Sequence, residues 1–158
     1  MKKKEEKKMT WGEVLARMQV FNSLPLERDG RSVTGAALAS IILLQVDYTR
    51  TAGEFEERLQ KAVERLRERL CPDYGEQMQK PEKERREGFA EDARKYMEAV
   101  NTMAAEEEQK ECPVSLRGLT REEFGELCAL GASGTAKHNG QDIPVAVLLR
   151  TAAQWVDA

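Results

Sequence analysis

The sequence stretch that decides the fold is YTRTAGEFEERLQKAVERLRERL, residues 48–70. Apolar residues recur along it at steps of three or four positions, and charged residues fill most positions between them. The residues of this first stripe are Tyr48, Ala52, Phe55, Leu59, Ala62, Leu66 and Leu70. A repeat near 3.5 residues is typical of a helix that packs along a coiled-coil seam. Because no proline interrupts residues 32–70, we expect one long helix there.

A second apolar stripe lies further along the chain, on an expected helix over residues 86–110. It consists of Phe89, Ala93, Tyr96, Val100 and Met103. Two narrow stripes joined by a polar, proline-containing turn predict an antiparallel, coiled-coil-like hairpin over residues 48–110, which we call the arm. The first-stripe residues expected to face the second stripe are Tyr48, Phe55, Leu59 and Leu66. The alternative is that each helix packs separately on the core.

Two capping boxes mark the starts of further helices. Thr10 and Glu13 precede an apolar pattern that predicts a helix over residues 11–22, and Thr120 and Glu123 precede a shorter one. In such a box the threonine hydroxyl and the glutamate carboxylate each accept a backbone amide at the helix start.

The remaining segments are assigned from local chemistry. Residues 33–46 are apolar almost all round, which predicts burial on several sides. Residues 132–141 are rich in glycine and small polar side chains, so we expect a flexible loop. Asp142 is expected to cap a last helix, with Pro144 in its first turn.

The composition agrees with a helical fold. The chain has 158 residues, a length typical of one domain, and Ala, Glu, Lys, Arg and Leu together make up about half of it. Aromatic residues are only 6% of the chain, whereas a β-sandwich or barrel needs many aromatic and β-branched side chains. We therefore expect an all-α fold with at most a short extended segment near residues 113–118. Its parts are a disordered charged tail (1–9) and a single helical domain (10–158), made of the arm (48–110) and a helical base (11–47 and 114–157).

Three cysteines, Cys71, Cys112 and Cys128, and one histidine, His138, are the first residues to consider for a metal or redox site. They contain no CxxC pair, and structural zinc sites usually draw their ligands from closely spaced pairs. A catalytic histidine needs a nucleophile or an orienting acid, for which Cys128 and Asp142 are the nominal candidates. Nothing in the spacing brings these residues together, so we interpret His138 as an exposed loop residue. We predict no catalytic, cofactor-binding or metal-binding residues, no small-molecule substrate and no enzyme activity.

The expected turn of the arm carries the residues that we assign to a partner contact. These residues are Tyr74, Met78, Lys83, Arg85 and Arg86. Glutamates alternate with the basic residues here, and the whole chain has a formal net charge of -3, so the unopposed positive charge of a nucleic-acid binder is missing. We therefore expect a protein partner. Apolar residues beside the stripes, such as Val63 and Met97, also favour a homo-oligomer.

The apolar segments are too short for a membrane or a signal peptide. The longest apolar run, residues 36–44, is well below the roughly 20 residues that span a bilayer. The basic residues at the start are followed by polar residues, where a signal peptide would have an apolar segment. We expect no membrane contact and no secretion by a signal peptide.

Short pieces of the sequence, with the order of the elements around them, carry a family resemblance. The pieces are Ser23-Leu24-Pro25-Leu26, before the long helix, and Gly118-Leu119-Thr120-Arg121-Glu122-Glu123-Phe124, after the return helix. Over residues 11–130 the chain resembles a family of small tailed-phage proteins of unknown function, encoded in the tail region. The glycine-rich loop and the helix from Pro144 have no counterpart. The resemblance implies a phage or prophage origin, a location in the host cytoplasm or the virion, and no particular chemistry.

These observations favour a non-enzymatic, helical interaction protein that serves as a phage or prophage structural or assembly component. The alternative is a small regulatory protein that binds a host protein or DNA. A basic face would favour DNA, whereas an exposed apolar patch above about 400 Å² would favour a protein partner.

Overall fold

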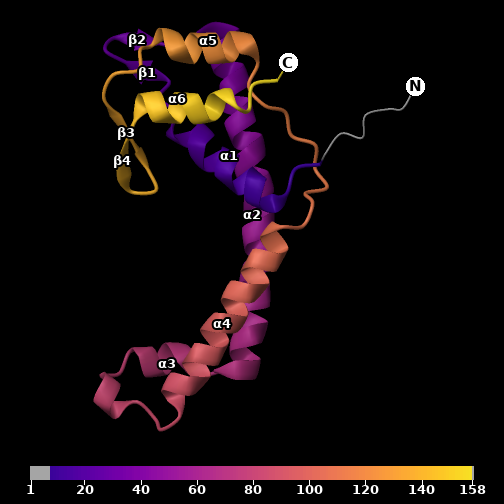
Figure 1. Cartoon of the computed structure of the whole chain (residues 1–158), viewed down its shortest axis with the longest axis vertical. Helices are drawn as coiled ribbons and strands as arrows, with labels where there is room; N and C mark the ends of the chain where they lie inside the picture. Colours follow the sequence, from indigo (N-terminus) through magenta and orange to yellow (C-terminus); the bar gives the residue numbers. More distant parts are fainter. Residues whose placement is uncertain (1–7, 158) are drawn as a thin grey trace, which may run out of the picture. The chain divides into compact units, whose positions relative to one another are not determined.

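The computed structural model describes residues 8–157 and is mostly helical (Figure 1). The predicted tail therefore lies outside the described residues, apart from Lys8 and Met9. The helices are α1 (Trp11–Ser23), α2 (Gly35–Leu70), α3 (Tyr74–Met78), α4 (Phe89–Glu108), α5 (Arg121–Ala129) and α6 (Val145–Ala153), with a 3-10 turn, η1 (Glu82–Glu84). The strands are β1 (Glu27–Arg28), β2 (Arg31–Ser32), β3 (Thr135–His138) and β4 (Gln141–Pro144). The predominantly helical fold and the long helix are confirmed.

The chain divides into two compact units, which we describe separately. The base unit runs up to Gly53 and resumes at Glu111, and the inserted unit is Glu54–Lys110. Tyr48 belongs to the base unit, so the prediction that it faces the second stripe is wrong. Its hydroxyl donates to the Arg117 carbonyl at 2.7 Å, and its ring packs edge-on against Phe21 with 5.1 Å between the ring centroids.

The two predicted capping boxes are confirmed. The Glu13 amide donates to the Thr10 hydroxyl at 3.2 Å, and the Glu123 amide donates to the Thr120 hydroxyl at 3.1 Å. In both boxes the glutamate carboxylate accepts the amide of the threonine in return. The cap predicted at Asp142 is wrong, because this residue lies in β4 and its carboxylate pairs with Lys137 at 2.9 Å.

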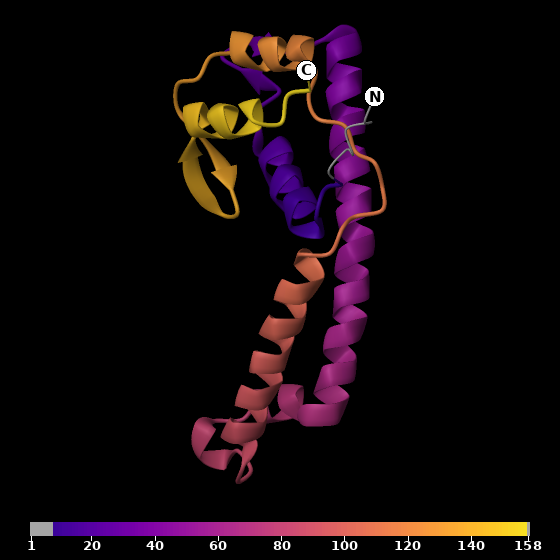
Figure 2. The same ribbon diagram turned by 45° about the vertical axis from the view of Figure 1, so that its right-hand side comes forward.

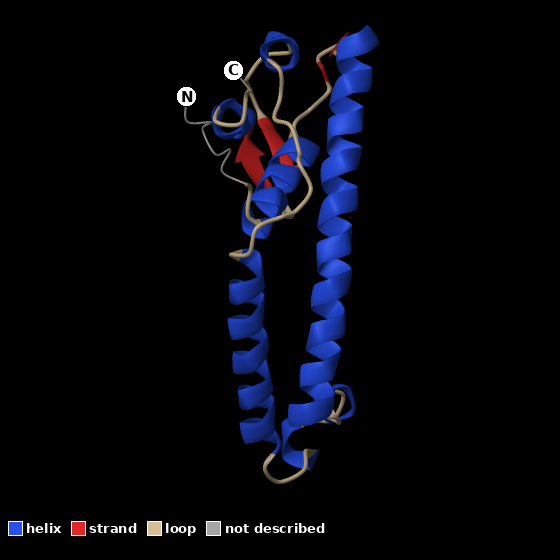
Figure 3. Cartoon of the chain, turned by 90° about the vertical axis from the view of Figure 1, so that its right-hand side faces the viewer, coloured by secondary structure: helices blue, strands red, loops and turns tan. Residues whose placement is uncertain are grey.

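The structure contains two small antiparallel sheets, one of which replaces the predicted loop. β1 pairs with β2 and β3 pairs with β4, so the loop expected over residues 132–141 is wrong and the extended structure is not near residues 113–118. Figure 3 shows the β3–β4 hairpin in red. Its turn is Asn139-Gly140 and that of β1–β2 is Asp29-Gly30, and all four residues have a positive φ. Asn-Gly and Asp-Gly pairs favour the tight two-residue hairpin turn, because the backbone twist of this turn matches the twist of the two flanking strands.

The core of the base unit joins the first helix to the C-terminal elements, with α6 beside α1 (Figure 2). The largest fully buried side chains of this unit include Val14, Phe21, Val33, Leu44, Tyr48, Leu119 and Val145. The prediction that residues 33–46 are buried on several sides is wrong. Ile42, Leu43 and Val46 of α2 are 43%, 61% and 48% exposed, so one face of the helix is apolar and open.

An ion pair fixes the start of α5 to α2 within the base unit. The Arg117 guanidinium lies 2.7 Å from the Glu123 carboxylate and donates to the Ser40 carbonyl at 3.0 Å. Glu123 is only 3% exposed. Burial by itself would raise the pKa of Glu123, but the hydrogen bonds from Arg117 and the Thr120 amide outweigh burial and lower it to about 2.

The inserted unit contains the C-terminal part of α2 and the antiparallel helix α4 (Figure 3). Leu66 and Leu70 pack against the buried cluster of Cys71, Phe89 and Tyr96 at one end. At the other end the Arg58 guanidinium lies 3.7 Å from the Glu107 carboxylate. Four stripe residues between the ends are only half-buried, namely Leu59, Ala62, Val100 and Met103, whereas Tyr96 is buried. No helix in the described part of the chain is long and apolar enough to cross a bilayer.

Candidate functional site

The candidate site is a groove in the inserted unit, where the chain passes from α2 through α3 and η1 into α4. Helix α2 ends at Leu70, and Cys71-Pro72 follows it directly. Asp73 is the residue before α3, but its side chain makes no cap hydrogen bond because its carboxylate binds Arg86 instead. Asp73 thus does not cap α3 and instead contacts Arg86, which lies in the segment that leads into α4.

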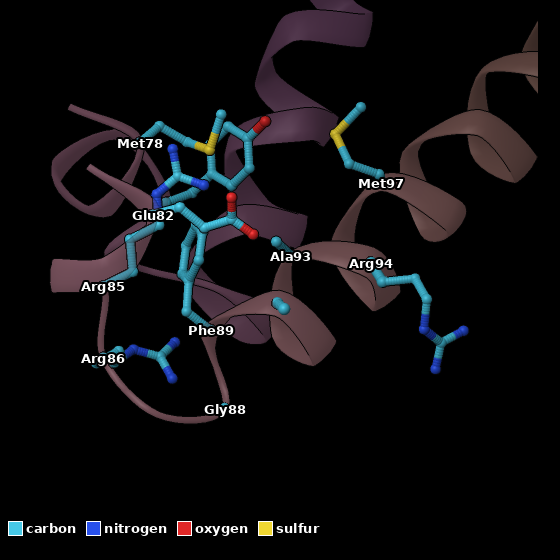
Figure 4. A pocket seen from close by; sticks show the side chains of 11 residues that line it. Met78, Glu82, Arg85, Arg86, Gly88, Phe89, Ala93, Arg94 and Met97 are labelled. Carbon is cyan, nitrogen blue, oxygen red and sulfur yellow. The ribbon is translucent and has the colours of Figure 1, made fainter. Parts of the chain in front are cut away.

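The groove has a volume of about 440 Å³ and mainly apolar walls (Figure 4). Its apolar lining comes from Tyr74, Met78, Phe89, Ala90, Ala93 and Met97. The methionines Met78 and Met97 are 45% and 42% exposed. Methionine side chains are flexible and polarizable, so they adapt to irregular apolar surfaces of a binding partner.

A buried cluster beneath the groove holds its walls in place. Cys71, Phe89 and Tyr96 are all buried there, and the Tyr74 ring lies 6.1 Å from Phe89 and 5.0 Å from Tyr96, centroid to centroid. Burial raises the pKa of the Cys71 thiol, with a smaller contribution from the nearby Asp73 carboxylate. The thiol is therefore protonated at neutral pH and acts as an apolar packing group.

Arg86 connects Asp73, the residue before α3, to Asp92 in α4. Its guanidinium contacts Asp73 through two nitrogens, at 2.6 and 3.0 Å, and Asp92 at 2.9 Å. The hydrogen bonds from Arg86 lower the pKa of Asp73. The Arg86 amide also donates to the Oε1 atom of the buried Gln77 at 3.0 Å. These contacts give Arg86 a positioning role and occupy its charge.

Arg85 is held differently from Arg86. Its Nε–H donates to the Gln77 carbonyl at 3.1 Å and to the Lys80 carbonyl at 3.2 Å, and its guanidinium carbon lies 5.7 Å from the centre of the Phe89 ring. The side chain is half-buried at the groove wall. Figure 4 shows its guanidinium beside Met78.

Four of the five residues predicted for a partner contact line this groove, namely Tyr74, Met78, Arg85 and Arg86, whereas Lys83 does not. Sequence reasoning missed the contribution of α4. Phe89 and Ala93 had been assigned to the stripe, yet they also form a groove wall together with Met97. The available signal was Met97, which lies one residue beyond Tyr96 and therefore off the stripe.

The nominal catalytic residues are not brought into one site. His138 lies in β3, and its Nδ1 atom is 2.9 Å from the Ser23 hydroxyl, which donates to the Gln19 carbonyl at 2.7 Å. Asp142 pairs with Lys137, as described above. Cys128 is an exposed residue of α5. Partial desolvation of its thiol by the surrounding protein raises the pKa of Cys128. Across residues 8–157, no group of three or more His, Cys, Asp or Glu side chains is placed to hold a metal ion.

A larger cavity of about 700 Å³ lies in the base unit. Its charged lining contains both signs: Lys8, Arg17 and Arg117 against Glu13 and Asp157. Arg117 and Asp157 are already used by the protein, since Arg117 binds Glu123 and the Asp157 carboxylate accepts the Gly118 amide at 2.9 Å. The groove of the inserted unit is therefore the stronger candidate, because its methionines are exposed and Arg85 forms no ion pair with any carboxylate of residues 8–157.

Comparison with known proteins gave no match to a family model, to a curated protein or to a solved structure. The resemblance to small tailed-phage proteins thus stays a prediction.

Proposed function

We propose that this chain is a non-enzymatic, helical interaction protein that binds a protein partner through the groove of the inserted unit. One observation carries this proposal. The groove exposes two methionines on a wall that buried aromatic packing and the Arg86 contacts hold in shape. An apolar groove that is already formed loses little conformational entropy when a partner side chain enters it.

We further propose that the two stripes form a coiled-coil-like hairpin and that a second copy of the chain covers their half-buried residues. The support is the partial exposure of Leu59 and Met103, which a single antiparallel pair does not remove. A phage or prophage assembly component fits both proposals, because such a protein binds to itself and to neighbours. Light scattering over a range of concentrations tests self-association, and a constant mass of 17.9 kDa would contradict it.

The main proposal is tested by selecting random displayed peptides on the full chain and measuring their affinity for groove variants. Met97→Gln removes apolar contact at nearly constant size, and we expect it to weaken the selected peptides about tenfold. Lys95→Gln is the matched control, because Lys95 is an exposed neighbour on α4 that does not line the groove. Equal affinities for the two variants would contradict a groove-based function.

A further inference from the structure

The groove contains one arginine that is not paired with a carboxylate in the described part of the chain. Three arginines line it, namely Arg85, Arg86 and Arg94. Arg86 is bound by Asp73 and Asp92, and Arg94 forms ion pairs with Glu91 at 3.2 Å and Glu98 at 2.8 Å. Arg85 forms no ion pair with any carboxylate among the described residues, and its two terminal nitrogens donate no hydrogen bond there.

The free end of Arg85 is held in a fixed position. Its Nε–H is bound by two backbone carbonyls, and its guanidinium carbon lies near the Phe89 ring, as described above. Only the two terminal NH₂ groups are left, and together they match the two oxygens of a carboxylate. A half-buried guanidinium that is already oriented loses less side-chain entropy on binding than a free surface arginine does.

A carboxylate of the chain itself already enters the groove. Glu82 of η1 lines it, and Figure 4 shows the Glu82 carboxylate pointing over Phe89 towards Ala93. Glu82 is exposed and forms no ion pair among the described residues. The groove therefore accommodates a carboxylate between its apolar walls, on a short turn from which the side chain can rotate away.

We propose that the groove recognises an acidic residue beside an apolar anchor on its protein partner, and that Glu82, whose carboxylate enters the groove without pairing with Arg85, competes with this residue for the space between the apolar walls. This inference rests on the proposed function and names the chemistry of the partner. The apolar anchor contacts Met78, Phe89 and Met97, and the carboxylate of the partner receives the terminal N–H groups of Arg85. Glu82 rotates into solvent when the partner carboxylate enters. In the free protein Glu82 reduces the apparent affinity for acidic ligands.

The test uses peptides selected from a random displayed library on the full chain, resynthesised with each acidic residue replaced by glutamine. On the wild-type chain we expect one acidic-to-glutamine change to lower the affinity about tenfold. On Arg85→Gln the same peptide change should have almost no effect. Lys83→Gln is the matched control, since it removes the same charge two residues earlier from a side chain outside the groove.

Glu82→Gln gives an independent readout that leaves every described ion pair intact. We expect it to raise the affinity for the acidic peptide severalfold and to leave the affinity for its glutamine counterpart nearly unchanged. This variant also covers the case in which Arg85→Gln disturbs the segment between α3 and α4, which circular dichroism would reveal. An equal effect of Glu82→Gln on both peptides would overturn the competition.

The outcomes separate this inference from the proposed function. Peptides that lose affinity on Met97→Gln but show no acidic preference would overturn only the partner chemistry. Failure to select any peptide that depends on Met97 would overturn the groove itself. An acidic preference that survives in Arg85→Gln but disappears in Lys83→Gln would move the recognition outside the groove and overturn the assignment to Arg85.

Discussion

Replacing Glu123 by glutamine should destabilise the base unit in a strongly pH-dependent way. The pKa of Glu123 is lowered from an ordinary 4.5 to about 2, so its ionised form stabilises the folded state. A difference of about 2.5 units corresponds to ~3 kcal/mol. Because the folded pKa is the lower one, this stability is complete above the unfolded pKa and is lost as pH falls through the folded pKa. The expected contribution is ~3 kcal/mol at pH 5 and above, ~1.4 at pH 3 and ~0.4 at pH 2.

The substitution isolates charge from helix capping. Glutamine at this position of a capping box can still accept the Thr120 amide through its carbonyl oxygen. Glu122→Gln is the matched control, because Glu122 is an exposed neighbour in the same turn. We expect its effect on the free energy of unfolding to stay within about 0.5 kcal/mol.

Urea unfolding followed by tryptophan fluorescence provides the assay. Both tryptophans, Trp11 and Trp155, lie in the base unit with the Arg117–Glu123 pair, so the signal reports this unit. The difference in unfolding free energy between wild type and Glu123→Gln should fall steadily between pH 5 and pH 2. A difference that stays constant over this range would refute the assignment of the stability to the ionised carboxylate.

Three further predictions address packing and reactivity. Gly118→Ala should lower the free energy of unfolding by about 3 kcal/mol or more, because a Cβ atom would overlap the Trp155 carbonyl. Gly125→Ala in α5 has open space and should raise it by up to about 1 kcal/mol, and thermal melts compare the two variants. Tyr96→Ala should cost about 3–4 kcal/mol, since this side chain is only 6% exposed, and helicity followed by circular dichroism should show the loss in the inserted unit. A thiol reagent should modify Cys128 in the native chain, faster as pH rises through and beyond the ordinary thiol pKa of 9.0, and the other two cysteines only after unfolding; mass spectrometry counts the labels.

Periodicity and capping chemistry placed α1, α2, α4 and α5, whereas the short helix α3 was not predicted and α6 is capped by Pro144 and not by Asp142. The helix predicted at residues 11–22 is Trp11–Ser23, and the one predicted at 32–70 begins at Gly35. The later start has a physical reason, since Ser32 pairs with Glu27 in a small sheet. Helix boundaries depend on such competing local hydrogen bonds, which a repeat of apolar residues does not report.

The two hairpins were missed although their turns are visible in the sequence. Asp29-Gly30 and Asn139-Gly140 are the dipeptides that tight hairpin turns favour. Their flanking strands are two to four residues long and too polar to show an alternating pattern. In this chain the turn residues were therefore a better guide to extended structure than strand patterning was.

The site was only partly predictable. Sequence position brought Tyr74, Met78 and Arg85 to the expected turn, but it could not distinguish Arg85 from Arg86. That distinction depends on which carboxylates fold back to meet them: Asp73 and Asp92 reach Arg86, and none among the described residues reaches Arg85. Likewise the exposure of Leu43 on α2 follows from how few elements cover that face, which composition does not report.

The base unit is discontinuous in sequence, and this has a consequence for its synthesis on the ribosome. The Cys112 amide donates to the Met9 carbonyl at 2.8 Å, and Thr10 bridges to Glu111, so the first segment meets its partner only after the inserted unit has been made. At roughly 5–20 residues per second, about a hundred residues take some 5–20 s. During this time α1 and the apolar start of α2 lack α5 and α6, whereas the contiguous inserted unit can already fold. We therefore expect nascent chains arrested before α5 to protect the inserted unit, but not α1, from proteolysis.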